Sequence, residues 1–159
     1  MSRALFYSLA ACAVSVGLEA LFAGRGIKLR LAELRVPRFA PPLWGWVVIG
    51  ILYYVTCFVV LYRLFARAQD TQGRSWALGA ALALMFVNAL WNYFFFRTRN
   101  LFHAFLISLP YALLALGLFL LLLWLDRLAA FCLVPYLLYL FYAGTFGYRV
   151  WKLNSPSGV

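Results

Sequence analysis

Two asparagines lie inside residues 76–96, an apolar run long enough to cross a membrane. Asn88, Trp91, Asn92 and Phe95 are spaced i, i+3, i+4 and i+7, so they share one face of a helix. An amide in hydrocarbon is costly unless a partner satisfies it, so polar groups at this depth face a bundle interior or a cavity. This face is therefore a candidate ligand site, with ordinary helix packing as the alternative.

Two further helical faces could complete such a site. In the run 43–66, one face carries Trp46, Gly50, Tyr53 and Cys57, and Trp44 and Tyr54 lie near it. In the run 128–150, one face carries Pro135, Tyr139, Tyr142 and Phe146, and Ala143 lies beside it. Aromatic rings supply stacking area, and a few amides or hydroxyls fix orientation, so the three faces could enclose a flat, mostly apolar ligand. Aromatic stripes at this spacing are also ordinary packing, and spacing alone leaves both interpretations open.

Few titratable side chains accompany these faces. Glu19 is the one acidic residue inside an apolar run, where it could line a cavity or extend toward the membrane surface. His103 has no Cys, Asp or Glu at ligand spacing, which predicts hydrogen bonding at the membrane interface and no metal site. No Ser-His-Asp pattern, carboxylate pair, phosphate-binding loop or dinucleotide motif is present, so no catalytic residue is predicted.

The elements that position these residues are expected to be membrane helices. The chain has 159 residues, of which 67% are hydrophobic and 11% charged, far from the balance of a soluble domain. Continuous apolar runs predict an all-α integral membrane protein, a single five-transmembrane-helix domain over residues 1–159, with spans at about 4–24, 43–66, 76–96, 101–124 and 128–150. The first span resembles a signal peptide near Cys12, but its apolar character continues to Phe22, which favours a retained helix.

The long first loop, residues 25–42, is basic in its middle and ends in Pro37, Pro41 and Pro42. Prolines fix the backbone, so this segment is expected to be stiff. It could be a lid over one end of the bundle or a connector lying on the membrane surface.

The net charge of +10 suggests membrane orientation and lipid headgroups, since no nucleic-acid motif is present. The more basic side comprises Arg25, Lys28, Arg30, Arg35, Arg38, Arg97, Arg99, Arg149 and Lys152. The other side has fewer basic residues, namely Arg3, Arg63, Arg67, Arg74 and Arg127. The positive-inside rule then predicts a cytoplasmic C-terminus. A bacterial membrane is expected, because the N-terminus does not read as a transit peptide.

The third span has a second face of small residues. Gly79, Ala83 and Val87 are four residues apart and lie away from the Asn88 face. Small residues at this spacing let helices approach closely in lipid, so a homodimer through the third helix is expected.

Three segments, in order along the chain, resemble motifs of the translocator protein family, also called tryptophan-rich sensory proteins (TspO/MBR). Pro37-Arg-Phe-Ala-Pro41-Pro42-Leu-Trp44 resembles the family's P-x-W-x-P-P-x-W. Asn88-Ala-Leu-Trp91, followed by a run of phenylalanines that begins with Phe94-Phe95, resembles its N-x-x-W-x-x-x-F-F, and Val134-Pro135-Tyr136-Leu-Leu-Tyr139 resembles its V-P-Y-L-x-W. The match covers about residues 37–154 and marks a divergent member.

The resemblance implies a five-helix bundle, often dimeric through the third helix, with a pocket beneath the first loop. In the family that pocket binds porphyrins and other tetrapyrroles such as protoporphyrin or haem, and in some members sterol-like molecules. Carried over by position, the pocket would involve Trp44, Trp46, Tyr54, Asn88, Trp91, Phe95, Tyr139 and Ala143.

This sequence departs from the family pattern at several tryptophans. Phe39 stands where the family usually has Trp, and Gly50 and Tyr139 replace the tryptophans linked to porphyrin breakdown in some members. The expectation is therefore a protein that binds a tetrapyrrole for transport, sensing or regulation, without an enzymatic role or a resident cofactor. The alternatives are a porphyrin-degrading enzyme and a membrane scaffold that acts through partner proteins.

Overall fold

The computed structural model describes residues 2–66 and 72–155, and this part of the chain is helical throughout its regular structure. The elements are α1 (Arg3–Ala23), α2 (Ile27–Glu33), α3 (Leu43–Ala66), α4 (Gln72–Asn92) with its π-helical extension η1 (Tyr93–Arg97), α5 (Leu101–Leu125) and α6 (Arg127–Leu153). All except the short α2 are long and apolar enough to cross a membrane, η1 being counted with α4. The predicted all-α bundle with five spans is confirmed. Arg67 and both extreme ends of the predicted 1–159 domain lie outside the described residues.

The span boundaries agree with the sequence to within a few residues. The largest difference at a start is in α4, which begins at Gln72 and not near residue 76. Gln72, Arg74 and Ser75 are polar, so the apolar run underestimates a helix that continues beyond the hydrocarbon region.

Side-chain caps fix the starts of three helices. Ser2 Oγ accepts the Leu5 N–H at 3.3 Å before α1, and Asn100 Oδ1 accepts the His103 N–H at 3.0 Å before α5. Asp126 Oδ1 accepts the Ala129 N–H at 3.2 Å at the start of α6. Each cap satisfies a backbone donor that the first turn of a helix leaves unpaired.

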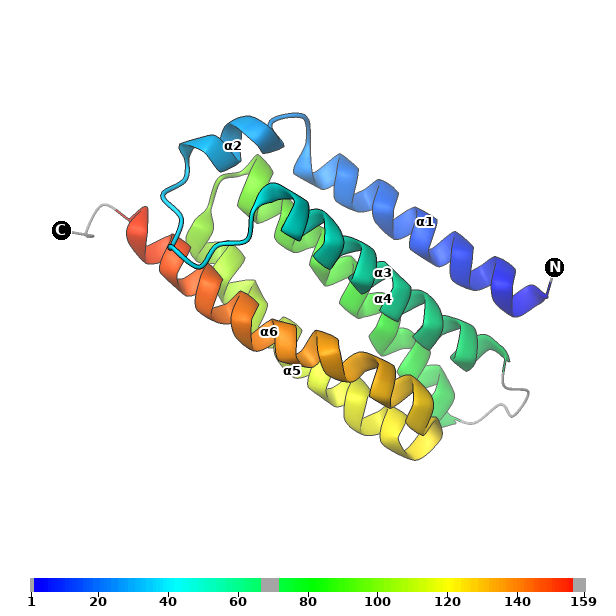
Figure 1. Ribbon diagram of the computed structural model, residues 1–159. Coiled ribbons are helices and arrows are strands. Elements are labelled where there is room, and N and C mark those ends of the chain that lie inside the picture. The colour runs from blue at the N-terminus through cyan, green and yellow to red at the C-terminus, as the bar shows by residue number, and fades with distance from the viewer. Residues whose placement is uncertain (1, 67–71, 156–159) are drawn as a thin grey trace.

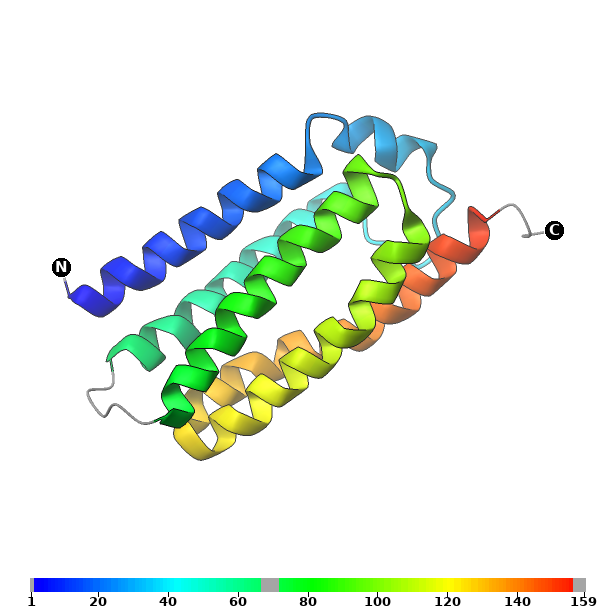
Figure 2. The ribbon, with the colours of Figure 1, turned by 180° about the vertical axis from the view of Figure 1, so that it is seen from behind.

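The five long helices run up and down as a bundle, with α1 at one side. Figures 1 and 2 both place α1 against α3 and α4, while α5 and α6 form a hairpin that packs on α4 and α3. The α2 segment and the C-terminal end of α6 lie at one end of the bundle, and the N-terminus lies at the other (Figure 1). The more basic side expected from the loops is therefore the α2 end.

The core away from α2 is tightly packed. Leu61, Leu122, Ala77, Ala129 and Ala130 have no solvent exposure. Small alanines on facing helices let the backbones approach closely, which is how helices associate when lipid removes the hydrophobic drive between them.

A partly buried ion pair links helices at the same end of the bundle. Arg63 Nε lies 2.8 Å from Asp126 Oδ2, and the Asp126 side chain is only 2% exposed. Asp126 thus joins α3 to the turn between α5 and α6 while it also caps α6.

Candidate ligand-binding site

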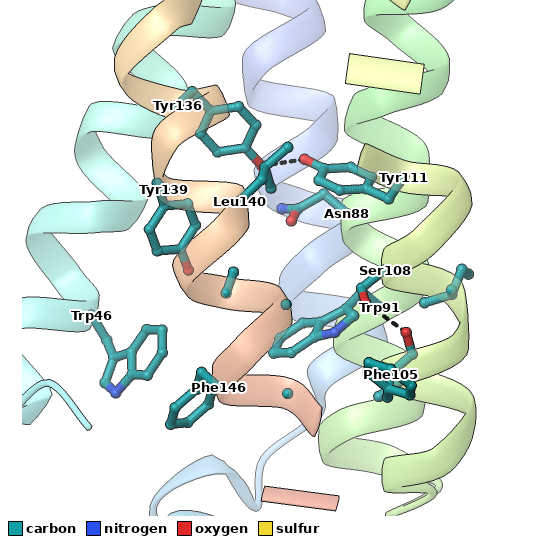
Figure 3. A pocket seen from close by; sticks show the side chains of 15 residues that line it. Trp46, Asn88, Trp91, Phe105, Ser108, Tyr111, Tyr136, Tyr139, Leu140 and Phe146 are labelled. Atoms are coloured by element: carbon teal, nitrogen blue, oxygen red, sulfur yellow. Dashed lines mark hydrogen bonds between the residues drawn. The ribbon is translucent and has the colours of Figure 1, made fainter. Parts of the chain in front are cut away.

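A cavity of about 340 Å³ lies between α1, α3, α4 and α6 at the end covered by α2. Its wall is mostly aromatic and aliphatic, and we call it the main cavity. A smaller cavity of about 90 Å³ lies between α4, α5 and α6, and we call it the side cavity (Figure 3). The two share wall residues from three helices, namely Trp46, Asn88, Trp91, Tyr136, Tyr139 and Phe146. They therefore form two parts of one hollow region.

The structure brings all but one of the candidate site residues to these walls. The main cavity is lined by Trp46, Tyr54, Asn88, Trp91, Phe95 and Tyr139, and the side cavity reaches Ala143. Trp44 is 70% exposed and lines neither cavity. It precedes Trp46 by two residues, which on a helix is more than half a turn around the axis, so the two indoles point in different directions.

The asparagine face of α4 meets a carboxylate from α1. Asn88 Nδ2 donates to Glu19 Oε1 at 2.5 Å, across 69 residues of sequence, and both side chains line the main cavity. Asn92 Nδ2 donates to the Asn88 carbonyl oxygen at 3.0 Å. The sequence allowed Glu19 to line a cavity or to extend toward the membrane surface, and the structure places it in the cavity wall. The amides predicted to need partners therefore have them.

Aromatic stacking shapes the wall of the main cavity. The Trp91 and Phe95 rings are stacked, with centroids 4.6 Å apart and planes 18° from parallel. Trp46 packs on Phe146 with a centroid separation of 5.0 Å. Phe95 belongs to the π-helical turn η1, a form of helix that is rare and often found at functional sites. This wall is therefore built of aromatic rings that pack on one another.

Three buried tyrosines form a polar layer midway along the bundle. The hydroxyls of Tyr111 and Tyr136 are hydrogen-bonded to each other (Figure 3), and the Tyr53 ring packs against that of Tyr136. Tyr53 and Tyr136 line the main cavity, and Tyr111 and Tyr136 line the side cavity. Sequence reasoning assigned no ligand-site role to Tyr111 or Tyr136. Two signals in the sequence could have identified them: Tyr136 belongs to the motif at Val134–Tyr139, and Tyr111 is one of few polar side chains in its span.

The first loop folds over this end of the bundle. Ile27 and Leu31 of α2 line the main cavity, and Leu34 is buried against Phe95 and Phe146. Apolar burial therefore draws the loop onto the cavity, as expected of a lid. We refer to residues 24–42 as the lid segment.

Polar contacts hold the lid segment at several points. Asn154, the C-cap residue that follows α6, accepts the Arg35 N–H at 3.0 Å and donates to the Arg35 carbonyl at 2.9 Å. The Tyr142 hydroxyl donates to the Phe39 carbonyl at 3.1 Å. These bonds give the lid segment two anchors on α6.

A third anchor of the lid segment is ionic. Arg99 Nη1 lies 3.1 Å from Glu33 Oε2, and Arg30 donates to the Arg99 carbonyl at 3.3 Å. Arg99 has a positive φ of 56°, an uncommon backbone conformation for a non-glycine residue. Burial, followed by the nearby charge of Arg99, lowers the pKa of Arg30, although a guanidinium remains protonated at neutral pH.

Comparison with protein-family models gives a match to the TspO/MBR family over residues 8–152, which is nearly the whole chain. The chain belongs to the TspO/MBR family. Comparison with curated proteins gives no match. The family resemblance inferred from three motifs is thus confirmed, and the TspO/MBR match extends it to include most of α1.

Two positions at which this TspO/MBR protein departs from the family pattern lie in the main cavity. Gly50 and Tyr139 both line it, and a Cβ added at Gly50 would meet no atom within 4 Å. The departures therefore change the wall of the cavity itself: one indole is replaced by space and the other by a phenol.

The remaining candidate residues lie outside the two cavities. The His103 ring stacks on Phe94 at the start of α5, with centroids 5.6 Å apart. Among the described residues, no group of three His, Cys, Asp or Glu side chains could hold a metal ion. On α4 of this TspO/MBR chain, Gly79 and Ala83 are exposed and Val87 is half-buried. The small face is therefore largely uncovered in the single chain.

Proposed function

We propose that this TspO/MBR membrane protein binds a flat hydrophobic ligand in the main cavity, with tetrapyrroles as the leading class and sterol-like molecules as the second. The observation that carries the proposal is the cavity of about 340 Å³, walled by Trp46, Trp91, Phe95 and Tyr139 and covered by the lid segment. Ligand sites are usually preformed, mostly apolar hollows of about 300–1,000 Å³ with a few placed polar groups, and this one fits that description.

The chemistry of the wall favours contact with the face of a ring. Stacking on indole and phenyl groups recognises a planar apolar body, and the Asn88 amide adds a polar group that can fix orientation. The residues that line the main cavity include no His, Cys or Met to act as an axial ligand for haem iron. Metal-free protoporphyrin is therefore the better first probe.

Titration of the purified protein with protoporphyrin, followed by tryptophan quenching, tests the proposal. Trp91→Ala removes a central ring and is expected to weaken binding by about 2 kcal/mol or more, roughly 30-fold, as for a buried aromatic anchor. Asn88→Ala should weaken it as well. Trp124→Ala is the matched control, because Trp124 is 92% exposed and lines neither cavity.

Absence of saturable quenching would refute the proposal. So would equal midpoints in Trp91→Ala, Asn88→Ala and Trp124→Ala. Either result would favour the alternative in which the aromatics only pack and the protein acts through partner proteins. Competition by a sterol against bound protoporphyrin would show whether sterol-like molecules share the site.

We propose binding for transport, sensing or regulation, without turnover. Gly50 and Tyr139 supply no indole at the two positions where the family resemblance links tryptophans to porphyrin breakdown. Illumination of the protoporphyrin complex tests this point. A new absorbing product formed with the wild-type protein, and not with Trp91→Ala, would establish the enzymatic alternative.

We also propose a homodimer through α4 and a cytoplasmic C-terminus in a bacterial membrane. The uncovered small face of Gly79 and Ala83 supports the dimer. The basic residues of α2 and of the α6 end, which lie at the same end of the bundle (Figure 1), support the orientation. Cysteine accessibility from each side of oriented vesicles would test the orientation.

A further inference from the structure

Among the residues that the structure describes, Glu19 is the one acidic side chain in the wall of the main cavity. The other lining residues are aliphatic, aromatic, or neutral amides and phenols. The chain as a whole carries a net charge of +10, yet no Lys or Arg of residues 2–66 and 72–155 lines this cavity. The wall thus holds an acidic group with no basic group beside it, unlike the basic protein that surrounds it.

The partners of Glu19 are neutral. Its carboxylate accepts from Asn88 Nδ2 at 2.5 Å and neighbours the Tyr54 hydroxyl, which itself donates to Ser15 Oγ at 3.4 Å. Within residues 2–66 and 72–155, Glu19 forms no ion pair, whereas Glu33 and Asp126 both pair with arginines. A carboxylate at membrane depth is costly without a positive partner, so a cation bound beside Glu19 would favour the charged form of its side chain.

A second polar group in the same wall lacks a strong partner. The Tyr53 side chain is 5% exposed, lines the main cavity, and its hydroxyl has no hydrogen-bond partner among the described residues. Its polar neighbours are the Cys57 thiol, a weak hydrogen-bonding group, and the Tyr111 hydroxyl, which is already hydrogen-bonded to Tyr136. Buried hydroxyls normally have partners, so Tyr53 indicates that a polar atom of an occupant belongs in this part of the cavity.

The rings around Glu19 have the chemistry that suits a cation. Trp46, Trp91 and Tyr139 are electron-rich rings that line the main cavity together with Glu19. A positively charged nitrogen is attracted to such faces, most strongly to Trp, and an adjacent carboxylate adds a direct ionic partner. A carboxylate among aromatic rings is thus a recognition site for an organic cation.

We infer that the main cavity selects planar apolar ligands that carry a positively charged nitrogen, with Glu19 as the ionic partner and the tryptophans as the stacking surface. The inference rests on the proposed ligand-binding function of the cavity and names the charge of the ligand. A tetrapyrrole in this cavity would have to keep its acidic substituents away from Glu19.

Two probes that differ in charge test the inference. N-methylacridinium is a fixed cation, and acridine is a neutral molecule of nearly the same shape at neutral pH. Binding of each is measured by dye fluorescence with the purified full-length protein in a neutral detergent. The wild-type protein is expected to prefer the cation by about tenfold or more, beyond any preference of the detergent alone.

Glu19→Gln keeps an oxygen for the Asn88 bond and removes the charge. It should abolish the preference by weakening N-methylacridinium binding, with acridine binding little changed. Glu33→Gln is the matched control, because it removes one negative charge from the lid segment outside the cavity wall. Its ratio of affinities should equal that of the wild-type protein.

The possible outcomes separate this inference from the proposed function. If the wild-type protein binds protoporphyrin and acridine but shows no preference for the cation, the inference is wrong and the binding function stands. A preference that survives in Glu19→Gln also overturns it. Failure of every probe to bind saturably overturns the proposed function together with the inference.

Discussion

Asn154 offers a direct measurement of how firmly the lid segment is held. Its side chain makes two hydrogen bonds to the backbone of Arg35, at 3.0 and 2.9 Å, and Asn154→Ala removes both. A neutral hydrogen bond contributes about 0.5–1.5 kcal/mol net, and these two are exposed to solvent, so the lower half of that range applies. The expected loss is about 1–2 kcal/mol in the free energy of local opening.

Amide hydrogen exchange reports this quantity without any ligand. The Arg35 N–H donates to Asn154 Oδ1, so its protection reflects opening of this anchor. A loss of about 1–2 kcal/mol predicts exchange about 5–30-fold faster in peptides that cover residues 34–38. Asn154→Asp keeps an acceptor for the Arg35 N–H and loses the donor to the Arg35 carbonyl, so an intermediate effect is expected.

The ion pair of the lid segment should matter less. Arg99 and Glu33 have side chains that are 54% and 49% exposed, and exposed pairs contribute about 0–1 kcal/mol. Glu33→Gln is therefore expected to accelerate exchange less than Asn154→Ala does, with an effect that shrinks at high salt. Unchanged Arg35 exchange in Asn154→Ala, or a larger effect in Glu33→Gln, would refute this account of the anchors.

Two further predictions concern the rest of the bundle. Asp126→Ala removes the hydrogen-bonded partner of Arg63 and uncaps α6, so it should lower the free energy of unfolding in detergent titrations by about 2–4 kcal/mol. Asp126→Asn keeps the cap and should cost about 1 kcal/mol less. A loss below about 1 kcal/mol for Asp126→Ala would contradict the role of the pair. Gly79→Leu should shift a dimer toward monomer by size-exclusion chromatography with light scattering. Gly117→Leu is its control, because Gly117 also faces open space but lies on α5.

The fold followed from the sequence because a bilayer leaves few alternatives. Backbone groups in hydrocarbon must pair within the segment, so continuous apolar runs become helices and their number fixes the architecture. Hydropathy was less informative at helix ends, where polar residues extend the helix into water. Gln72 at the start of α4 and Lys152 near the end of α6 are examples.

The site was predictable only where its residues share a helix. The Asn88 and Trp91 face follows from helical periodicity and from the cost of amides in lipid. The bond between Asn88 and Glu19 joins residues 69 apart, and no local pattern specifies that contact. Trp44 shows the opposite problem: a sequence motif predicts that it lies in the site, but its position on α3 turns its side chain outward.

The tyrosine layer explains why the hollow region occupies one half of the bundle. Beyond Tyr53, Tyr111 and Tyr136, away from α2, the interior is filled by fully buried residues such as Leu61 and Leu122. Toward α2, large rings meet at angles and leave space that aliphatic side chains do not fill. The phenols thus form a floor whose polar edge faces the cavity. An occupant bound against this floor would rest on hydroxyls at one end and on apolar residues of the lid segment at the other, so the fold itself favours an amphipathic ligand.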